Sequence, residues 1–423
     1  MVAEAERNEA GPWAVIRVAS GNFLEMYDFQ VFGYYAAAIG AAFFPSRDPF
    51  ISLLSSFMAF GAAFLMRPLG AVLLGAYADR HGRRAGLLLT LSLMSVGILT
   101  LTLTPGYAVI GLAAPIAVLA GRLLQGFSAG MELGGVSVYL AEIAPPGRKG
   151  FYTSWQSASQ QVAVVLAAAI GILLTSRLSP GAMTAWGWRI PLAVGCLIVP
   201  VLLALRRSLP ETRAFAERTS HPGWGEIFRA LAGHWRRIGI GVLMTTLTTV
   251  TFYMITVYTP TFGAQVLGLP ALPVFAVTAA VGVSNFIWLP VMGALSDRVG
   301  RKPVLLAIGG VMLVGAYPAM LWLVQAPSFG RLLAVELFFS FVFGSYNGAL
   351  VAYLTEIVPQ SLRAAGFSVA FSTATALFGG FTPAVSTLLV HATGNRAAPG
   401  LWLAGAAVLS LFAVVIARPA PPE

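Results

Sequence analysis

Two carboxylates lie close together in the first long apolar stretch of the chain. Glu25 and Asp28 are three residues apart within residues 14–44, so they share one face of a helix. A charged side chain deep in a membrane is costly and in most cases functional. Because two ionised carboxylates this close repel each other, one of them could take up and release a proton near neutral pH. The spacing predicts proton coupling here, and the alternative is a carboxylate that stays permanently paired.

Two arginines also lie inside apolar stretches. Arg122 is about 14 residues from the start of the stretch 108–141, roughly 21 Å at about 1.5 Å per residue, and Asp28 is about 16 residues from the end of its own stretch. Their matching depths predict an ion pair that protonation or an anionic substrate could open, with a purely structural pair as the alternative. Arg67 is also deep, where it could meet substrate or hold a neighbouring helix beside Pro68.

Two further acids lie in apolar stretches. Glu132 follows Arg122 by ten residues, where it could belong to a proton relay, an inner gate or a helix contact. Glu336 has no role that the sequence assigns. The proton-coupling set that we predict comprises Glu25, Asp28 and Glu132. No histidine lies at mid-depth and Cys196 is the lone cysteine, so we expect no metal site and no cofactor. No nucleophile or phosphate-binding loop is visible in the sequence either, so we expect no enzyme chemistry.

Uncharged polar residues gather at a similar depth in both halves of the chain. Gln156 and Gln160 are four residues apart and share a helix face. Each such residue by itself is more often a contact between helices, but as a set they suit a hydroxylated, carboxylate-rich ligand. The predicted substrate-binding set comprises Asn22, Tyr27, Arg67, Arg122, Gln156, Gln160, Tyr253, Asn285, Tyr346 and Asn347.

These residues need an all-α integral membrane protein to position them. Of the 423 residues, 57% are hydrophobic and 10% are charged, which excludes a soluble globular domain and a disordered chain. Twelve stretches are long enough to span a bilayer as helices. They lie near residues 14–44, 50–78, 85–104, 108–141, 149–176, 188–205, 237–267, 272–296, 303–325, 331–355, 362–390 and 398–417.

The basic residues set the expected orientation. Most of the 26 Lys and Arg residues fall in segments on one side if both termini are cytoplasmic. We therefore expect a multi-pass protein of the cell inner (plasma) membrane with both termini in the cytoplasm. The net charge of +10 then reflects membrane topology and needs no nucleic-acid partner. The lipid bilayer is the expected environment, and a monomer is the expected state.

Two motifs repeat along the chain. Residues 75–84 (GAYADRHGRR) return as 293–302 (GALSDRVGRK), so that Asp297 takes the place of Asp79 in the second copy. Residues 139–145 (YLAEIAP) return as 353–359 (YLTEIVP) at a nearly equal offset. Two pseudo-symmetric six-helix halves are therefore expected, with substrate at mid-membrane between them. The predicted parts are residues 1–206 as the N-terminal half, 207–235 as a cytoplasmic linker and 236–423 as the C-terminal half.

The repeated loops predict gates at the inner face. Asp79 and Asp297 lie where a helix meets the cytoplasm, so each could pair with a helix end or an arginine across that face and favour one conformation. The predicted gating set comprises Asp79, Arg80, Arg83, Glu142, Asp297, Arg298, Arg301 and Glu356.

The organisation resembles the major facilitator superfamily, whose signature is the G-x-x-x-D-R-x-G-R-[RK] loop. Further motifs resemble the metabolite:proton symporter family and, within it, the citrate and tricarballylate carriers. They are residues 20–29 (SGNFLEMYDF), 66–70 (MRPLG), 121–126 (GRLLQG), 151–161 (FYTSWQSASQQ), 186–191 (WGWRIP) and 283–290 (VSNFIWLP). The resemblance implies a carrier that takes up citrate, or next tricarballylate, with protons by alternating access. It also implies pairing of an acid on the first span with an arginine on the fourth.

Other functions remain open at this point. Coupling could use sodium, and the substrate could be another organic anion. A drug-efflux antiporter is less expected, because Arg67 and Arg122 would be out of place in a roomy apolar cavity. A receptor would need a sizeable soluble part, and the longest segment between spans is only 207–235.

Overall fold

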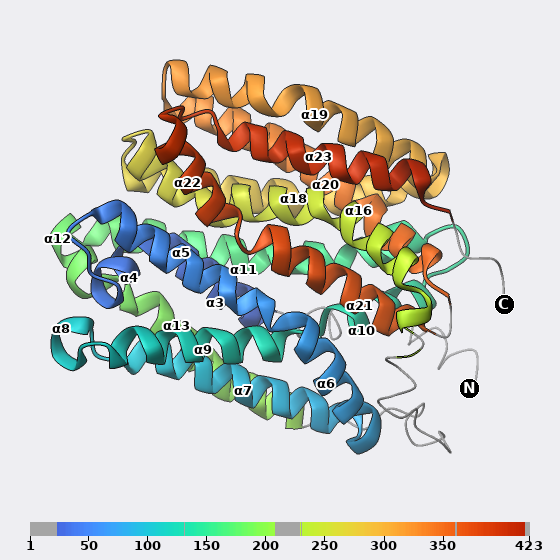
Figure 1. Ribbon diagram of the computed structural model, residues 1–423, viewed down its shortest axis with the longest axis horizontal. Helices are drawn as coiled ribbons and strands as arrows, with labels where there is room; N and C mark the ends of the chain where they lie inside the picture. Colours follow the sequence, from blue (N-terminus) through green and yellow to red (C-terminus); the bar gives the residue numbers. More distant parts are fainter. Residues whose placement is uncertain (1–22, 131, 208–228, 230, 360–361, 419–423) are drawn as a thin grey trace.

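The protein is a bundle of helices that run roughly side by side (Figure 1). The computed structural model describes residues 23–130, 132–207, 229, 231–359 and 362–418; at positions 76, 78–80, 83–84, 132–134, 201–202 and 205–207 it describes the backbone alone. Helices suit these apolar sequences because each backbone N–H and C=O group is satisfied within its own segment, as the interior of a bilayer requires.

The N-terminal half contains the first twelve described helices in chain order. They are α3 (Phe23–Tyr34), α4 (Ala36–Phe43), α5 (Pro49–Leu65), α6 (Arg67–His81), α7 (Arg83–Leu103), α8 (Tyr107–Ile110), α9 (Ala113–Ala129), α10 (Glu132–Glu142), α11 (Lys149–Arg177), α12 (Pro180–Ala182), the π-helix η2 (Met183–Gly187) and α13 (Arg189–Arg207).

The C-terminal half begins after the segment that the sequence predicts as a linker. Its helices are α16 (Trp235–Tyr253), η3 (Met254–Tyr258), α17 (Thr259–Thr261), η4 (Phe262–Val266), α18 (Ala271–Val299), α19 (Arg301–Gln325), α20 (Phe329–Ile357), α21 (Arg363–Ala374), η6 (Thr375–Gly379), α22 (Thr382–Thr393) and α23 (Pro399–Ile416).

Where the structure describes them, the stretches predicted to cross the membrane are mostly helical. Within the described ranges, nine helical segments are long and apolar enough to span a bilayer, and the pair Pro180–Gly187 and Arg189–Pro200, bent by 42°, adds a tenth. The two remaining predicted spans are α3 with α4, which follow the undescribed residues 1–22, and α9 with α10, which lie on either side of residue 131. The twelve-helix fold expected from the sequence is therefore confirmed.

The seventh and eleventh predicted spans, residues 237–267 and 362–390, contain π-helical segments; they are called span 7 and span 11 below. In span 7, η3 and η4 flank Pro260, which has no N–H to donate to the preceding turn. In span 11, η6 ends just before the turn that holds Pro383. Such segments leave backbone carbonyls without their usual partners and are frequent at functional sites. Both segments lie in helices that contact the N-terminal half, since η3 packs on α3 and η6 packs on α5.

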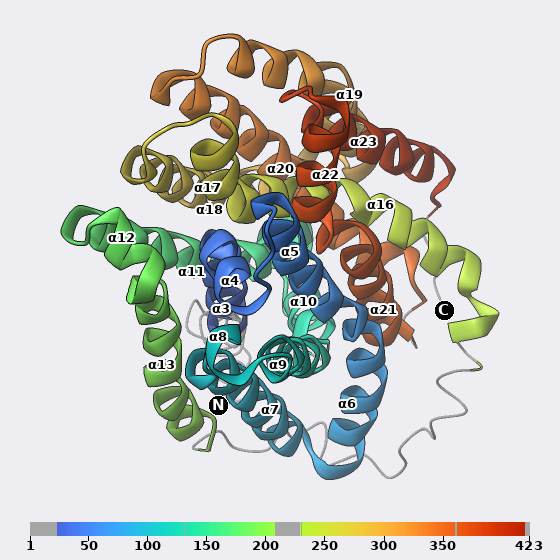
Figure 2. The same ribbon diagram turned by 60° about the vertical axis from the view of Figure 1, so that its left-hand side comes forward.

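The two halves pack against each other most extensively through α11 and α18. Gly150 and Gly293 lie backbone to backbone at one end of this contact, and a side chain on either would collide with the other's carbonyl. In Figure 2, α11 lies at the edge of the first half, next to α18 of the second half. The glycines therefore set how closely the halves approach each other.

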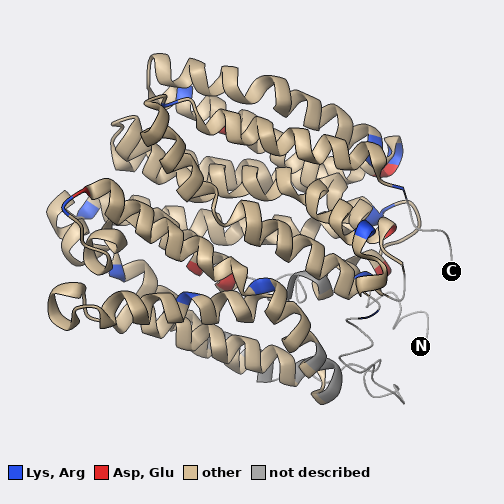
Figure 3. Cartoon of the chain, in the orientation of Figure 1, with Lys and Arg blue, Asp and Glu red and all other residues tan. Residues whose placement is uncertain are grey.

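Charge is distributed unevenly along the bundle. Figure 3 shows few charged residues within it and a concentration of Lys and Arg at the end that holds the start of α11 and the last turns of α18 and α23. Below, this is named the termini end. The concentration is the pattern from which the sequence predicts a cytoplasmic location for that end.

Candidate functional site

A buried ion pair joins the first and fourth spans. Arg122 Nη1 on α9 lies 2.6 Å from Asp28 Oδ2 on α3, and the two side chains are 0% and 1% exposed. This is the pair that their matching depths predict. The same Nη1 donates to Gln125 Oε1 at 2.6 Å, one turn further along α9. Gln125 is absent from the predicted set, although its three-residue spacing from Arg122 places it on the same helix face.

A second buried ion pair lies beside the first. Arg67, the first residue of α6, donates from Nη2 to Glu25 Oε1. The sequence left the partner of Arg67 open between substrate and backbone carbonyls, and the structure places it on a carboxylate. Each acid of α3 is therefore paired with an arginine, Glu25 with Arg67 and Asp28 with Arg122.

Aromatic rings enclose both guanidinium groups. The ring of Phe29 lies between them, 5.0 Å from Arg67 Cζ and 4.8 Å from Arg122 Cζ. Phe64 lies 4.5 Å from Arg67, and Phe32 lies 4.3 Å from Arg122. These distances are those of cation–π contacts. The rings also keep the effective dielectric low, which strengthens each charge interaction inside the site.

The cluster has hydrogen-bonding capacity to spare. Within the described part of the chain, Asp28 Oδ1, Arg122 Nε, Arg122 Nη2 and Gln125 Nε2 are buried and have no protein hydrogen-bond partner. A buried polar atom left without a partner costs about 1–3 kcal/mol. Arg122 therefore keeps two donors that water or an anionic ligand can use without breaking an existing contact.

The seventh span brings the second half to this cluster. Gln30 Nε2 on α3 donates to Thr256 Oγ1 in η3 at 3.3 Å. The ring of Tyr253 packs at 5.1 Å from Phe64 and at 5.9 Å from Phe60. Tyr253 belongs to the predicted substrate-binding set and does lie at the site. Gln30 and Thr256 are absent from that set, because the sequence gives no sign that these two helices face each other.

A second polar group links α11, α18 and α20. Asn285 Nδ2 donates to Gln161 Oε1 at 3.0 Å, and Ser340 Oγ donates to Asn285 Oδ1 at 2.7 Å. Gln161, and not the predicted Gln156 or Gln160, makes the contact between the halves. Gln156 is buried, and its Nε2 has no partner among the described residues. Gln160 is buried as well.

Two predicted tyrosines already use their hydroxyl protons. Tyr27 donates to the backbone carbonyl of Pro191 at 2.8 Å, and Tyr346 donates to that of Met244 at 3.0 Å. These contacts hold neighbouring helices together. Asn347 is buried, and its Oδ1 has no partner within the described ranges.

Some predicted residues fall outside what the structure describes. Asn22 lies in the undescribed N-terminal segment, and the side chains of Asp79, Arg80, Arg83 and Glu132 are not described.

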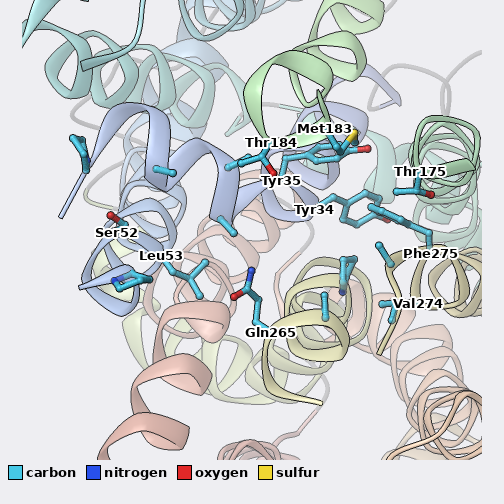
Figure 4. Close-up of a pocket in the computed structure, with 18 of the residues that line it drawn as sticks. Tyr34, Tyr35, Ser52, Leu53, Thr175, Met183, Thr184, Gln265, Val274 and Phe275 are labelled. Atoms are coloured by element: carbon cyan, nitrogen blue, oxygen red, sulfur yellow. The ribbon is translucent and has the colours of Figure 1, made fainter. Parts of the chain in front are cut away.

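A cavity of about 500 Å³ opens at the end away from the termini. It is lined from both halves, by Tyr34, Tyr35 and Leu53 of the first and by Gln265 and Phe275 of the second. In Figure 4, Tyr34 and Phe275 lie next to each other, and the Gln265 side chain points into the cavity. The ring centroids of Tyr34 and Phe275 are 5.6 Å apart in an edge-to-face contact. Asp28 precedes Tyr34 on α3 by six residues, or about 9 Å at about 1.5 Å per residue.

At the opposite, termini end, Asp297 joins the two halves. Its two carboxylate oxygens accept from the backbone N–H groups of Gly150 at 2.8 Å and Phe151 at 2.9 Å, at the start of α11. Arg301 Nη2 lies 2.6 Å from Asp297, and Arg301 Nε lies 3.5 Å from Glu356. An acid at a helix N-terminus is stabilised by the unpaired N–H groups and by the helix dipole. The sequence predicts that Asp297 pairs with a helix end or an arginine across the inner face, and this contact between the halves is of that kind.

Other members of the gating set are placed differently. Arg298 and Glu142 are exposed and make no ion pair within the described ranges. Over the same residues, no group of three or more His, Cys, Asp or Glu side chains could hold a metal ion.

The comparisons with known proteins agree with this architecture. The family model described as Major Facilitator Superfamily matches residues 18–383. A citrate-proton symporter of Salmonella typhi is 58% identical over 403 residues, which covers 95% of this chain and 93% of that protein. One of Klebsiella pneumoniae is 55% identical, covering 95% and 90%, and an alpha-ketoglutarate permease of Escherichia coli (strain K12) is 36% identical, covering 87% and 85%.

Solved structures share the fold. The crystal structure of a D-xylose-proton symporter superposes with a TM-score of 0.75 at 20% identity, covering 94% of this chain and 96% of that one. At this identity the likeness concerns the fold alone. The family match over most of the chain, together with the relatives at 58% and 55% identity, shows that the chain belongs to the major facilitator superfamily.

Proposed function

We propose that this chain carries citrate across a membrane together with protons, by alternating access. The buried Asp28–Arg122 pair, with two arginine donors not yet used, is the observation that supports this most. The relatives from Salmonella typhi and Klebsiella pneumoniae both bear the name citrate-proton symporter, which supports the same substrate and coupling ion.

The ion pair gives a direct way to couple a proton to an anion. While Asp28 is ionised, it neutralises Arg122, and its negative charge repels a carboxylate that approaches the unused Nε and Nη2. Protonation of Asp28 removes that repulsion. The guanidinium can then hold two oxygens of a citrate carboxylate in a bidentate contact. Proton and citrate thus favour each other's binding, which is the thermodynamic requirement for symport.

The second pair can act in the same way. Arg67 and Glu25 lie next to the first pair and share the ring of Phe29 with it. Citrate has three carboxylates, so two neighbouring arginines can each take one. In this proposal Tyr253 and Gln125 complete the site, since both lie against the ion pairs.

The two ends of the bundle support alternating access. Asp297 joins the halves at the termini end, while the cavity with Tyr34 and Phe275 opens at the other. We propose that residues 1–206 and 236–423 rock against each other around the buried site, with 207–235 as the connection between them. Release of Asp297 from α11 then accompanies opening of the termini end.

The location follows from the charge pattern. We propose that the chain lies in the cell inner membrane as a monomer with both termini in the cytoplasm, because Lys and Arg concentrate at that end. Citrate would then enter from outside through the cavity. Tricarballylate, which lacks citrate's hydroxyl group, is the second candidate substrate.

Uptake of radiolabelled citrate into proteoliposomes tests this proposal. An inward proton gradient is expected to drive accumulation, and collapse of the gradient in a parallel sample is expected to abolish it. Unlabelled tricarballylate as competitor measures selectivity, and replacement of sodium by choline tests the coupling ion. Absence of citrate uptake in vesicles that contain correctly inserted protein would refute the proposal, as would accumulation that follows sodium and ignores pH.

A further inference from the structure

A third carboxylate is buried in the bundle and takes no part in the site described above. Glu336 on α20 is 1% exposed. Its Oε1 lies 2.8 Å from Thr259 Oγ1 in α17, and its Oε2 has no hydrogen-bond partner among the described residues. An ionised carboxylate in such a place is costly unless a positive charge compensates it.

No positive charge in the described part of the chain lies within ion-pair distance of Glu336. The helices packed on α20 explain why. Span 7 offers Tyr253 and Tyr258 there, and α19 offers Tyr317. Apart from Glu132, whose side chain is not described, the charged groups of these neighbours and of α20 itself lie near helix ends. Those towards the termini end are Asp297, Arg298, Arg301, Lys302, Lys149, Glu142, Arg236, Arg237, Arg363 and Glu356; those at the other end are Arg177 and Arg331, which donates to the Trp322 carbonyl.

The Thr259 hydroxyl has more acceptors around it than protons to donate if Glu336 is ionised. Thr259 Oγ1 lies 2.8 Å from Glu336 Oε1, 3.0 Å from the Ile255 carbonyl and 3.2 Å from the Met254 carbonyl. All three are acceptors, and a hydroxyl has one proton to donate. A protonated Glu336 instead donates to Thr259 Oγ1, and Thr259 then donates to Ile255. The neutral acid therefore satisfies one more hydrogen bond than the carboxylate does.

The internal repeat gives Glu336 a meaningful position. When YLAEIAP at 139–145 is aligned with YLTEIVP at 353–359 and the alignment is extended towards the N-terminus without a gap, Arg122 falls on Glu336. The second half thus has an ionisable group of opposite sign where the first half has the arginine of its ion pair. Thr259 follows Thr256 by one turn, and Thr256 contacts Gln30 beside the ion pairs. A change at Glu336 can therefore reach the citrate site along span 7.

We propose that Glu336 is a further proton-binding residue of the transport cycle, protonated while it is enclosed and deprotonated when span 7 moves and admits water. This inference rests on the proposed proton-coupled transport. Binding forms an O–H bond on the carboxylate with a proton from water on the open side, and release returns that proton to water on the other side. Citrate carries several negative charges, so a further protonated carboxylate lowers the net negative charge that must cross the membrane with citrate. Thr259 acts as the positioning residue.

The stoichiometry of transport tests the proposal. In proteoliposomes with the membrane potential clamped at zero, the pH difference that stops net citrate flux against a fixed citrate gradient gives the number of protons per citrate. Glu336→Gln keeps the size of the side chain and can still donate to Thr259, but it cannot titrate. We expect it to lose one proton per citrate, which lowers accumulation about tenfold at a pH difference of one unit. Exchange of citrate without a gradient should persist.

Infrared spectroscopy tests the same residue without any transport. The wild-type protein should show the C=O band of a buried, protonated carboxylic acid, and Glu336→Gln should lack that band. Thr259→Val should shift the band because the hydrogen-bond partner is lost, and Thr259→Ser should leave it in place. If the wild type moves no citrate, the proposed function fails while the infrared comparison still decides on Glu336. A band that survives Glu336→Gln, or an unchanged number of protons per citrate in that variant, would overturn the proposal.

Discussion

Replacement of Arg122 by lysine keeps the charge and removes the geometry of the guanidinium. In the structure, Arg122 Nη1 serves both Asp28 Oδ2 and Gln125 Oε1 at 2.6 Å, while Nε and Nη2 remain unused. A lysine ammonium can keep the contact with Asp28, because it is a compact point charge on a flexible stem. It cannot offer a planar pair of donors to a citrate carboxylate at the same time.

The expected loss follows from that second contact. A hydrogen bond to a charged partner is worth roughly 1.5–3 kcal/mol. Losing one arm of a bidentate contact should therefore raise the citrate Kd by about tenfold to somewhat more than a hundredfold. Stability should fall less, since the ion pair persists and the lysine stem still packs against Phe29 and Phe32. Transport at low citrate concentration should fall in proportion to affinity.

Citrate binding and the melting temperature should be measured on the same purified protein. Arg331→Lys is the matched control, because Arg331 also lies over an aromatic ring, at 4.7 Å from Trp322, but is far from the ion pairs. This control should bind citrate like the wild type. A structural pair alone would instead give an unstable Arg122→Lys protein whose folded fraction binds citrate normally. A stable Arg122→Lys protein with normal binding and transport would refute both a ligand role and a coupling role.

Three further predictions concern the other parts of the carrier. Glu25→Gln and Asp28→Asn should separate exchange from accumulation, so that at least one variant still exchanges citrate but cannot concentrate it; normal accumulation in both would contradict proton coupling at these acids. Asp297→Asn removes a charge that accepts from two N–H groups of α11, so it should shift the conformational equilibrium towards opening at the termini end by about tenfold. In a background without the native cysteine, cysteines introduced in the site should then be labelled faster. Citrate affinity should change little. Gly293→Val places a side chain against the Gly150 carbonyl, so the halves can no longer close together at the termini end. The variant should transport citrate more slowly while the same cysteines stay open to labelling. Transport at the wild-type rate would show that this close approach is unnecessary.

The sequence by itself determined the architecture and the depth of each key residue. Apolar stretches of about 20 residues become spanning helices because a bilayer leaves the backbone few alternatives. The rise per residue of a helix is fixed, so counting residues was enough to predict the ion pair between Asp28 and Arg122, which the structure confirms. The repeated loop likewise placed Asp297 where a helix end of the other half could meet it.

Only the tertiary structure decided which side chains face each other around the bundle. A residue count gives depth, but the rotation of a helix about its axis depends on packing against all of its neighbours. Thus Arg67 meets Glu25, and Gln161 rather than Gln156 or Gln160 crosses to Asn285. For the same reason, the sequence left Glu336 without a role, whereas the structure places it on Thr259. Thr259 directly follows the π-helical segment η3, and the turns of such a segment differ in rotation from those of a regular helix, so a residue count does not give the direction of this side chain.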